Sequence, residues 1–346
     1  TYGDFSDRAR RLAAALAPRI APGDPVAVLA PNCHPLLEAY YGVLGAGGML
    51  LPLNIRLSPV ELARIVDHAK PTILLADGSL ASTVDAISDA SALGPSPVWL
   101  DPPPEGRSEP AYEDLLTATT PAGWPRPVTD ENQIAELFYT SGTTGPPRGV
   151  MLTHRSLYLH AMSMLVAFRA SDRDVQLHTI ALYHVNGWGT PQAVTAVGGT
   201  HVIVRNFDPP RVFELIESER VTRIFAVPTM LLDLLEHPAL DHHDLSSLEL
   251  VDVGGAPMGP DLVRRAESQL GCRVIGGYGL TETGPIVALA SDKITCQRED
   301  DRRRLRRQAT AGMPLVGVEL AIVDDAGQPL PWDGHAAGEV VVRSNS

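Results

Sequence analysis

The chain has 346 residues and a formal net charge of −13, from 28 basic and 41 acidic side chains. A surface this acidic argues against nucleic acid as the main partner, because phosphate backbones need clustered Lys and Arg. The three cysteines (Cys33, Cys272 and Cys296) form no CxxC pair and no apolar run reaches the about 20 residues of a membrane span, so we expect a cytoplasmic protein with reduced thiols and no integral membrane contact.

The first part of the chain alternates between helical and extended patterns. Ser58, Pro59 and Glu61 form a strong helix start, with Ser58 as the N-cap, Pro59 at the first helical position and Glu61 closing a capping box. Alternation of helix and strand predicts parallel βαβ units with helices on both faces of a sheet. The expected helices span residues 5–16, 35–45 and 59–69, and the expected strands span residues 26–30, 49–53 and 72–76.

Residues 101–129 contain seven prolines, which favours an irregular connection between two lobes. After Gly312 the pattern changes to two antiparallel strands, at residues 318–323 and 338–343. We therefore predict a first α/β lobe over residues 1–129, a second over residues 130–311 and an antiparallel β portion over residues 312–346. Within the second lobe we expect strands at 134–139, 199–204, 223–227, 248–253 and 273–276, and helices from about 153 and at 209–219, 229–235 and 260–270.

Residues 139–150, YTSGTTGPPRGV, follow a predicted buried strand and combine glycines, four Ser or Thr side chains and one cation. Glycine lets the backbone approach an anion closely and adopt positive φ. Hydroxyl and backbone N–H groups both donate to phosphate oxygens, and Arg148 adds a charge-assisted contact. Taken alone, these residues favour a flexible surface turn over an anion-binding loop, because such clusters are common in loops. The GxxxxGK[ST] signature of P-loop NTPases is absent.

Three further segments place polar or aromatic residues where elements change. Thr281 and Glu282 lie in GGYGLTETG (276–284), directly after a strand, and taken alone they favour a helix start with Thr281 as the cap and Glu282 in the first turn. VGGAPM (253–258) reads as a strand-to-helix turn. His184 and Trp188 lie in ALYHVNGWGTP (181–191), although a lone His is usually structural and an aromatic side chain usually belongs to a core.

Together, and in this order, the segments resemble those of the adenylate-forming superfamily of acyl-CoA synthetases, adenylation domains and luciferases. The first loop resembles its signature loop, whose usual form ends in Pro-Lys-Gly-Val where this chain has Pro147-Arg148-Gly149-Val150. The similarity is closest to fatty-acyl-CoA ligases and covers the large N-terminal domain. It implies an α/β fold with two parallel-sheet lobes and helices on both faces, layered αβαβα, plus a small antiparallel β-barrel-like portion.

The resemblance also implies roles for individual residues. His184 would lie beside the reactive carboxylate, Tyr278 would stack on adenine, Thr281 would bind phosphate, and Glu282 would hold Mg²⁺. The expected catalytic groups are four: His184, Thr281, Glu282 and Arg148. The remaining expected contacts are Thr140, Ser141, Gly142, Thr143, Thr144 and Gly145 for the phosphates, Gly254, Gly255, Ala256 and Gly279 for the nucleotide, and Val185, Trp188, Pro228 and Gly279 for the acyl group.

The activity that the resemblance implies is ATP-dependent conversion of a carboxylic acid to an acyl-adenylate, followed by transfer to coenzyme A by an AMP-forming acid–thiol ligase. Amino-acid-activating domains carry an Asp in the segment matching residues 181–191; this chain has none there, which favours a non-amino carboxylic acid. The run HVNGW (184–188) resembles that of ligases for medium- or long-chain acids. A short-chain or aryl-acid CoA ligase, an adenylation domain that loads an acyl carrier protein, and a degenerate nucleotide-binding module stay open. So does a homodimer.

Family members continue past the position of Ser346 with a hinge and a small C-terminal domain, whose Lys assists adenylation. We expect residues 1–346 to end before both. We therefore expect the chain by itself to bind nucleotide weakly and to turn over slowly.

Overall fold

The structure is a computed structural model that describes residues 1–92, 96–121, 123–126, 128, 130–140 and 148–344. The chain folds as two compact units. Unit 1 comprises residues 1–155, 178–191 and 203–207, and unit 2 comprises the intervening segments and residues 208–346. Because these units alternate along the sequence whereas the predicted domains are continuous, the predicted boundaries at residues 129 and 311 stay predictions.

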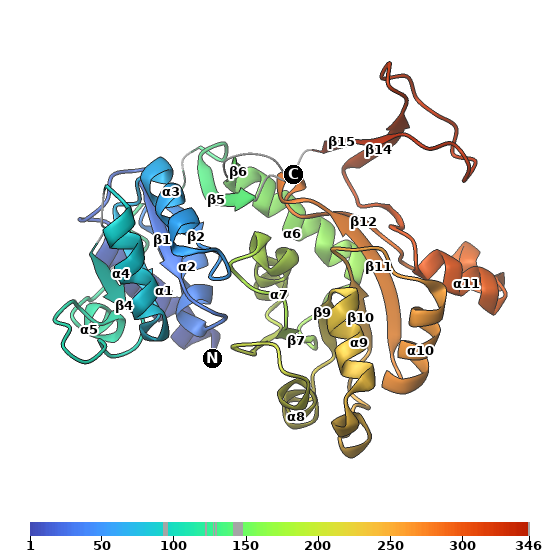
Figure 1. Ribbon diagram of the computed structural model, residues 1–346, viewed down its shortest axis with the longest axis horizontal. Helices are drawn as coiled ribbons and strands as arrows, with labels where there is room; N and C mark the ends of the chain where they lie inside the picture. Colours follow the sequence, from blue (N-terminus) through green and yellow to red (C-terminus); the bar gives the residue numbers. More distant parts are fainter. Residues whose placement is uncertain (93–95, 122, 127, 129, 141–147, 345–346) are drawn as a thin grey trace. The chain divides into compact units, whose positions relative to one another are not determined.

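Unit 1 is built on a six-stranded sheet in the order β4-β3-β1-β2-β5-β6 (Figure 1). The first five strands pair in parallel, as the alternating pattern predicts, and β6 pairs antiparallel with β5. The strands are β1 (Pro25–Leu29), β2 (Met49–Pro52), β3 (Ile73–Ala76), β4 (Pro97–Trp99), β5 (Ile134–Thr140) and β6 (Arg148–Thr153).

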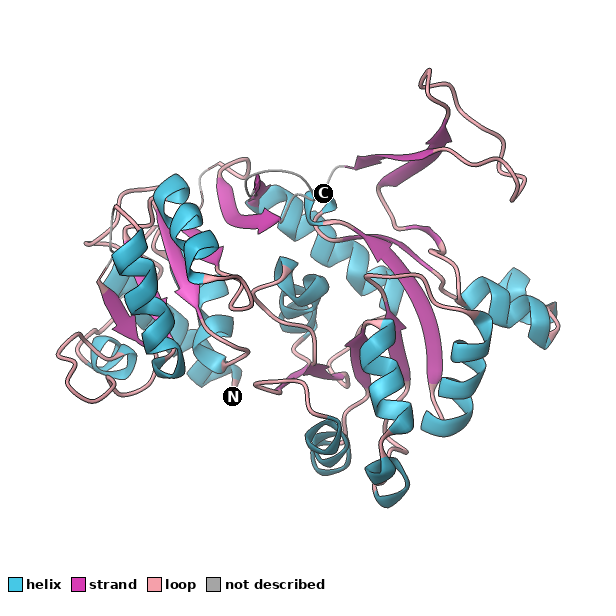
Figure 2. Cartoon of the chain, in the orientation of Figure 1, coloured by secondary structure: helices cyan, strands magenta, loops and turns pink. Residues whose placement is uncertain are grey.

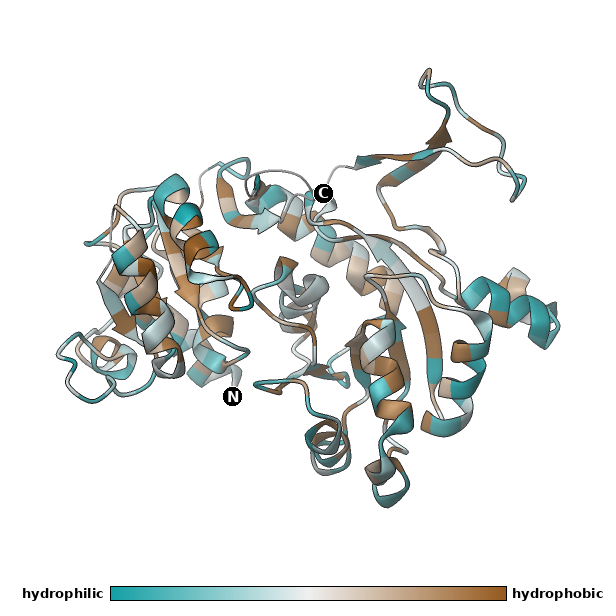
Figure 3. Ribbon diagram, in the orientation of Figure 1, coloured by the Kyte–Doolittle hydropathy of each residue, from teal (hydrophilic) through white to brown (hydrophobic). Residues whose placement is uncertain are grey.

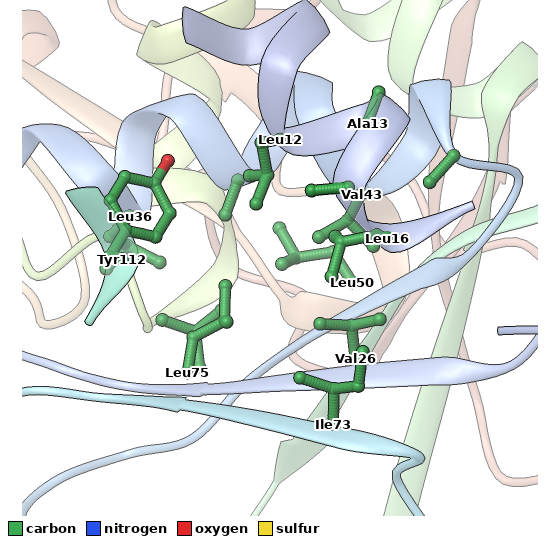
Figure 4. Close-up of a cluster of buried hydrophobic side chains, with 14 of the residues drawn as sticks. Leu12, Ala13, Leu16, Val26, Leu36, Val43, Leu50, Ile73, Leu75 and Tyr112 are labelled. Atoms are coloured by element: carbon green, nitrogen blue, oxygen red, sulfur yellow. The ribbon is translucent and has the colours of Figure 1, made fainter. Parts of the chain in front are cut away.

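Alternate residues of β1 enter two different hydrophobic clusters. Val26 and Val28 pack with α1 (Tyr2–Leu16) and α2 (His34–Gly45). Figure 4 shows Val26 among the side chains of this cluster. Ala27 and Leu29 pack with α3 (Pro59–Ala69) and α4 (Ala81–Ala90). Burial on both faces explains why the strand reads as a continuous apolar run, and it confirms the helices predicted on both faces of this sheet.

Helix α3 begins as its sequence predicts. The Ser58 hydroxyl accepts from the backbone N–H of Glu61 at 3.4 Å, and the Glu61 carboxylate accepts from the backbone N–H of Ser58 at 2.9 Å. Pro59 occupies the first helical turn. The reciprocal bonds satisfy donors that the helix itself leaves unpaired.

The segment expected to be an irregular connection holds a helix, α5 (Tyr112–Thr117). Its Tyr112, Leu115 and Leu116 are buried in the same cluster as α1 and α2. The prolines correctly mark the loops on either side, but the prediction is wrong for this part, because burial of three large side chains outweighs the local turn signals.

Unit 2 is built on a seven-stranded sheet in the order β13-β12-β11-β10-β9-β7-β8. Strands β7, β9, β10 and β11 pair in parallel, whereas β12 and β13 continue the sheet antiparallel. The strands are β7 (Val175–His178), β8 (Thr200–Ile203), β9 (Arg223–Ala226), β10 (Leu250–Val253), β11 (Arg273–Gly279), β12 (Ile286–Leu289) and β13 (Met313–Pro314), drawn in magenta in Figure 2.

Helices flank this sheet. Phe168 at the end of α6 packs on Phe225 of β9, with ring centroids 5.5 Å apart. Helix α10 is amphipathic, with Val263, Ala266 and Leu270 buried and polar residues between them (Figure 3). The helices are α6 (His154–Phe168), α7 (Thr190–Val197), α8 (Pro209–Glu219), α9 (Pro228–Glu236), α10 (Pro260–Leu270) and α11 (Asp301–Gln308); α8 and α10 match their predicted ranges.

The end of the described chain forms an antiparallel pair, β14 (Val318–Val323) with β15 (Glu339–Ser344). Two largely parallel sheets flanked by helices and a small antiparallel sheet confirm the predicted fold class. Of the helices in the described part of the chain, none combines the length and the apolar character needed to cross a membrane.

One ionic cluster joins three helices of unit 1, and it predicts an asymmetry in stability. The Glu38 side chain, 3% exposed, accepts from Arg8 Nε and from the Tyr112 hydroxyl, both at 2.7 Å. Glu113 also pairs with Arg8, at 2.6 Å, but is 55% exposed. Glu38→Ala should lower the free energy of unfolding in urea by about 2–3 kcal/mol, somewhat less than for a fully buried pair because Arg8 keeps Glu113.

The matched control is Glu113→Ala, which should cost less than about 1 kcal/mol, because exposed ion pairs contribute little. Equal losses for the two variants would show that burial of Glu38 does not set its contribution.

Candidate active-site residues

The predicted phosphate loop connects the two strands of the β5–β6 hairpin in unit 1. Its residues 141–147 lie outside the described residues, so Ser141, Gly142, Thr143, Thr144 and Gly145 stay predictions. The register of the hairpin places Thr140 directly opposite Arg148, and Tyr139 opposite Gly149. The hairpin therefore brings the first predicted hydroxyl and the predicted cation together at the two ends of the loop.

A histidine that the sequence does not single out supports the start of this loop. His68 Nδ1 of α3 lies 2.5 Å from the Tyr139 hydroxyl, and the rings meet edge to face. On the other strand, a Cβ added at Gly149 would lie 3.0 Å from Leu137 and 3.5 Å from the Tyr139 ring. Tyr139 is thus held between α3 and β6, and burial raises its pKa, which keeps the phenol protonated.

The segment that carries His184 also belongs to unit 1. The His184 side chain is exposed, and among the described residues it has no hydrogen-bond partner. Neighbouring groups displace part of the water around the imidazole, which lowers the pKa of His184, and the positive charge of Arg56 lowers this pKa further. The imidazole is therefore neutral at physiological pH. Val185 and Trp188, the predicted acyl contacts, are 5% and 8% exposed. Arg56 is a neighbouring cation that sequence reasoning missed.

In unit 2, the other predicted residues follow the carboxyl ends of neighbouring parallel strands. Pro228 begins α9 just after β9, and Gly254–Ala256 follow β10. Gly255 has φ +77°, a conformation that favours glycine, and the N–H of Gly254 donates to Ala226 at 3.1 Å. Tyr278 lies near the end of β11. Carboxyl ends of parallel strands are the usual place for ligands in open α/β sheets.

Thr281 and Glu282 lie in a short 3₁₀ turn (Thr281–Thr283) directly after β11. The Thr283 hydroxyl holds the turn, accepting from the Leu280 N–H at 3.0 Å and lying 2.9 Å from the Leu280 carbonyl. Thr281 is therefore not the cap of a helix, and within the described chain neither its hydroxyl nor the exposed Glu282 carboxylate has a side-chain partner. Both groups are available to a ligand.

Close packing behind this turn fixes its backbone. A Cβ at Gly279 would lie 1.8 Å from the Pro285 carbonyl oxygen, so only glycine fits there. Next to it, buried His160 of α6 accepts from the N–H of Ile286 at 3.1 Å. Burial lowers the pKa of His160 to about 4, which leaves its Nε2 free to accept. His160 is a second residue that the sequence does not reveal.

The comparisons with known proteins agree with this arrangement. A family model described as AMP-binding enzyme matches residues 1–346. The chain belongs to this family of AMP-binding enzymes. The resemblance to adenylate-forming enzymes that the motifs indicate is thereby confirmed.

Curated relatives of this AMP-binding chain include ligases for different acids. It is 37% identical to a long-chain-fatty-acid CoA ligase of Thermus thermophilus, over 99% of this chain and 63% of the relative. It is 34% identical to 4-hydroxybutyrate CoA ligase 2 of Metallosphaera sedula, over 100% and 64%. It is 32% identical to a peroxisomal benzoate CoA ligase of Arabidopsis thaliana, over 100% and 62%. The chain spans less than two thirds of the length of these relatives.

Among solved structures, the AMP-binding chain is similar to the inhibitor-bound N-terminal domain of FACL13 from Mycobacterium tuberculosis. The TM-score is 0.86 at 28% identity, covering 100% of this chain and 82% of that one. The similarity supports the predicted correspondence with an N-terminal domain.

Asp252 is an unexpected acid in the AMP-binding fold. It lies in the middle of β10, 1% exposed, and among the described residues neither carboxylate oxygen has a hydrogen-bond partner. A Cβ at Gly277 of β11 would lie 2.9 Å from its Oδ1. Burial raises the pKa of Asp252 from 3.8 to about 8, and the nearby backbone N–H of Val253, although it forms no hydrogen bond of normal geometry with the carboxylate, has a smaller effect in the opposite direction. The carboxyl is therefore mainly protonated at neutral pH.

The raised pKa predicts a pH-dependent stability. The folded protein keeps a proton that the unfolded chain releases above pH 3.8, so stability from this group is full below that pH and is lost as the pH rises to about 8. The loss approaches about 1.4 kcal/mol per pH unit at most. Asp252→Asn should remove this slope and become more stable than the wild type toward pH 8, as measured by urea unfolding at each pH.

Asp261→Asn is the control, because the Asp261 side chain is 91% exposed and should leave the slope unchanged. A wild-type slope that survives in Asp252→Asn would assign the pH dependence to another group.

Proposed function

We propose that the protein carrying this chain is an AMP-forming acid–CoA ligase. It joins a carboxylic acid to the α-phosphate of ATP, releases pyrophosphate, and then transfers the acyl group from AMP to the thiol of coenzyme A. The observation that carries the proposal is the Thr281–Glu282 turn, whose hydroxyl and carboxylate are both left for a ligand, in a chain of the AMP-binding family.

The chemistry needs positioning and charge stabilisation more than a covalent nucleophile. Attack of a carboxylate on phosphorus spreads negative charge over the phosphate oxygens. Arg148 and the hydroxyls of Thr140 and Thr281 would donate to these oxygens. Gly254–Ala256 would offer backbone groups to the adenine, and Tyr278 its ring face.

Glu282 suits a Mg²⁺ ion. A hard cation bound mainly by phosphate oxygens needs few protein carboxylates, and Glu282 is exposed and forms no ion pair with another described residue. Bound Mg²⁺ would neutralise charge on the phosphates. Glu282 would hold and orient the Mg²⁺–ATP complex.

The acyl group would meet His184, Val185 and Trp188. A neutral His184 can donate one N–H to the substrate carboxylate and so orient it without forming a tight ion pair. Apolar Val185 and Trp188 suit a hydrocarbon chain, and together with the Thermus relative they support a medium- or long-chain acid. The relatives named for 4-hydroxybutyrate and benzoate support short-chain or aryl acids as the second candidate.

Pyrophosphate release tests the proposal. The natural protein that carries this sequence, at its full natural length, is given Mg²⁺–ATP with octanoate, palmitate, 4-hydroxybutyrate or benzoate. We expect acid-dependent release, with the highest kcat/KM for octanoate or palmitate, and acyl-CoA and AMP when coenzyme A is added. No release with any acid contradicts the enzyme assignment. If the acyl group is transferred to an acyl carrier protein and not to coenzyme A, the proposed acceptor is wrong.

Glu282→Gln should lower kcat by about 10²-fold and raise the Mg²⁺ concentration needed for half-maximal rate, because the amide binds the ion far more weakly. Glu219→Gln, at an exposed carboxylate near the end of α8, serves as the control and should leave both quantities unchanged. If Glu282→Gln kept the Mg²⁺ dependence of the wild type, Glu282 would not be the residue that binds the metal.

A further inference from the structure

The loop that carries His184 has a backbone that must be held in place. Val185 and Trp188 have φ values of +25° and +60°, and between and beside them Gly187 and Gly189 have +48° and +79°. Side-chain-bearing residues rarely adopt such angles, and each costs about 1–3 kcal/mol. Such a conformation persists only where the surroundings impose it.

Asn32 supplies three of the bonds that fix the approach to this loop. Its Nδ2 donates to the carbonyl oxygens of His178 and Ile180, both at 3.0 Å, and its Oδ1 accepts from the N–H of Leu182 at 2.7 Å. Asn32 is 5% exposed and uses both amide donors and its oxygen. All four residues belong to unit 1.

Asn32 itself is held in place by the elements on either side of it. It lies between the carboxyl end of β1 and the start of α2, and both elements are part of the buried core of unit 1. One side chain thus holds every second residue of segment 178–182, which ends two residues before His184.

Helix α2 holds the same segment at two further points. The Tyr40 hydroxyl donates to the carbonyl of Leu182, and the Tyr41 hydroxyl donates to the carbonyl of Pro191 at 3.4 Å. Tyr40 is 2% exposed, and burial raises its pKa well above the ordinary value, so its hydroxyl stays a donor. The strained residues 185–189 are therefore anchored on both sides.

We propose that Asn32 is a positioning residue that, through its hydrogen bonds to residues 178–182 and with Tyr40, fixes His184 and Trp188 for the acyl substrate. The inference rests on the proposed function. Asn32 touches no reacting atom; it sets where the substrate carboxylate and hydrocarbon are held. The role should therefore affect the acid and leave ATP binding unchanged.

Asn32→Asp is the sharpest test. The carboxylate has nearly the same shape and still accepts from Leu182, but it cannot donate and faces two carbonyl oxygens. In the full-length natural protein we expect kcat to fall by about 10²-fold, because a small displacement of a reacting group has that effect. The KM for ATP should stay within about threefold of the wild type, while the KM for the acid rises.

Asn54→Asp is the matched control. Asn54 uses its Oδ1, which accepts from the backbone N–H of Arg56 at 3.0 Å, so the aspartate keeps this bond. It should leave kcat and both KM values unchanged. Equal effects of the two substitutions would overturn the proposal, because introduced charge alone would then explain the loss.

Amide hydrogen exchange separates this inference from the proposed function. Asn32→Asp should speed exchange of residues 182–189 and leave β1 and β10 unchanged, whether or not the protein is a ligase. If the wild type releases no pyrophosphate with any acid, the function fails while exchange still tests the anchoring. Unchanged exchange together with unchanged kinetics overturns the inference.

Should Asn32→Asp fail to fold, Tyr40→Phe carries the test, because it removes one hydroxyl and keeps the ring. A fall in kcat of about tenfold, with faster exchange of residues 182–189, supports the anchoring; wild-type kcat and exchange overturn it.

Discussion

Parallel pairing of short strands, buried on both faces, is the constraint on which the rest of the structure depends. Parallel strands all point the same way, so the residues that follow them gather at one edge of each sheet. In unit 1 that edge receives Asn32 after β1 and Arg56 after β2. In unit 2 it receives Gly254 after β10 and Thr281 after β11. Burial makes the strands themselves mainly apolar, with Asp252 of β10 as an exception, so most of the candidate functional residues lie at these edges and in the loops that follow the strands.

The departures from parallel pairing lie beside the candidate functional residues. Strand β6 turns back along β5 and so sets Arg148 opposite Thr140 across the ends of the predicted phosphate loop. Strand β12 turns back along β11, and its start brings Pro285 against Gly279. In each case a reversal of chain direction holds a loop at both ends. In the described loop of residues 280–285, this arrangement presents the backbone groups in a fixed geometry, which favours binding of a charged ligand without reorganisation.

Local patterns in the sequence predict most elements, and long-range contacts account for what they miss. The Ser58 capping box and the range of α10 follow from neighbouring residues, and the alternation of elements gives the fold class. Helix α5 is missed because burial of Tyr112 depends on distant helices. Asn32 is missed because its partners lie 146 to 150 residues away and are backbone groups, which carry no sequence signal. Asp252 is visible in the sequence as an acid within an apolar strand, but it belongs to none of the motifs.

Arg148 shows how a departure from a family pattern acquires physical meaning. The usual lysine would supply one point charge, whereas a guanidinium presents a planar fork that binds two oxygens at once. Arg148 is exposed at the first position of β6 and forms no ion pair with any described carboxylate, in a chain with 41 acidic side chains. The adjoining loop, residues 141–147, contains no acid either. A cation left unneutralised in so acidic a protein suits an external anion. An arginine would bind that anion through the planar geometry of the guanidinium as well as through its charge. Two oxygens of one phosphate group fit this geometry.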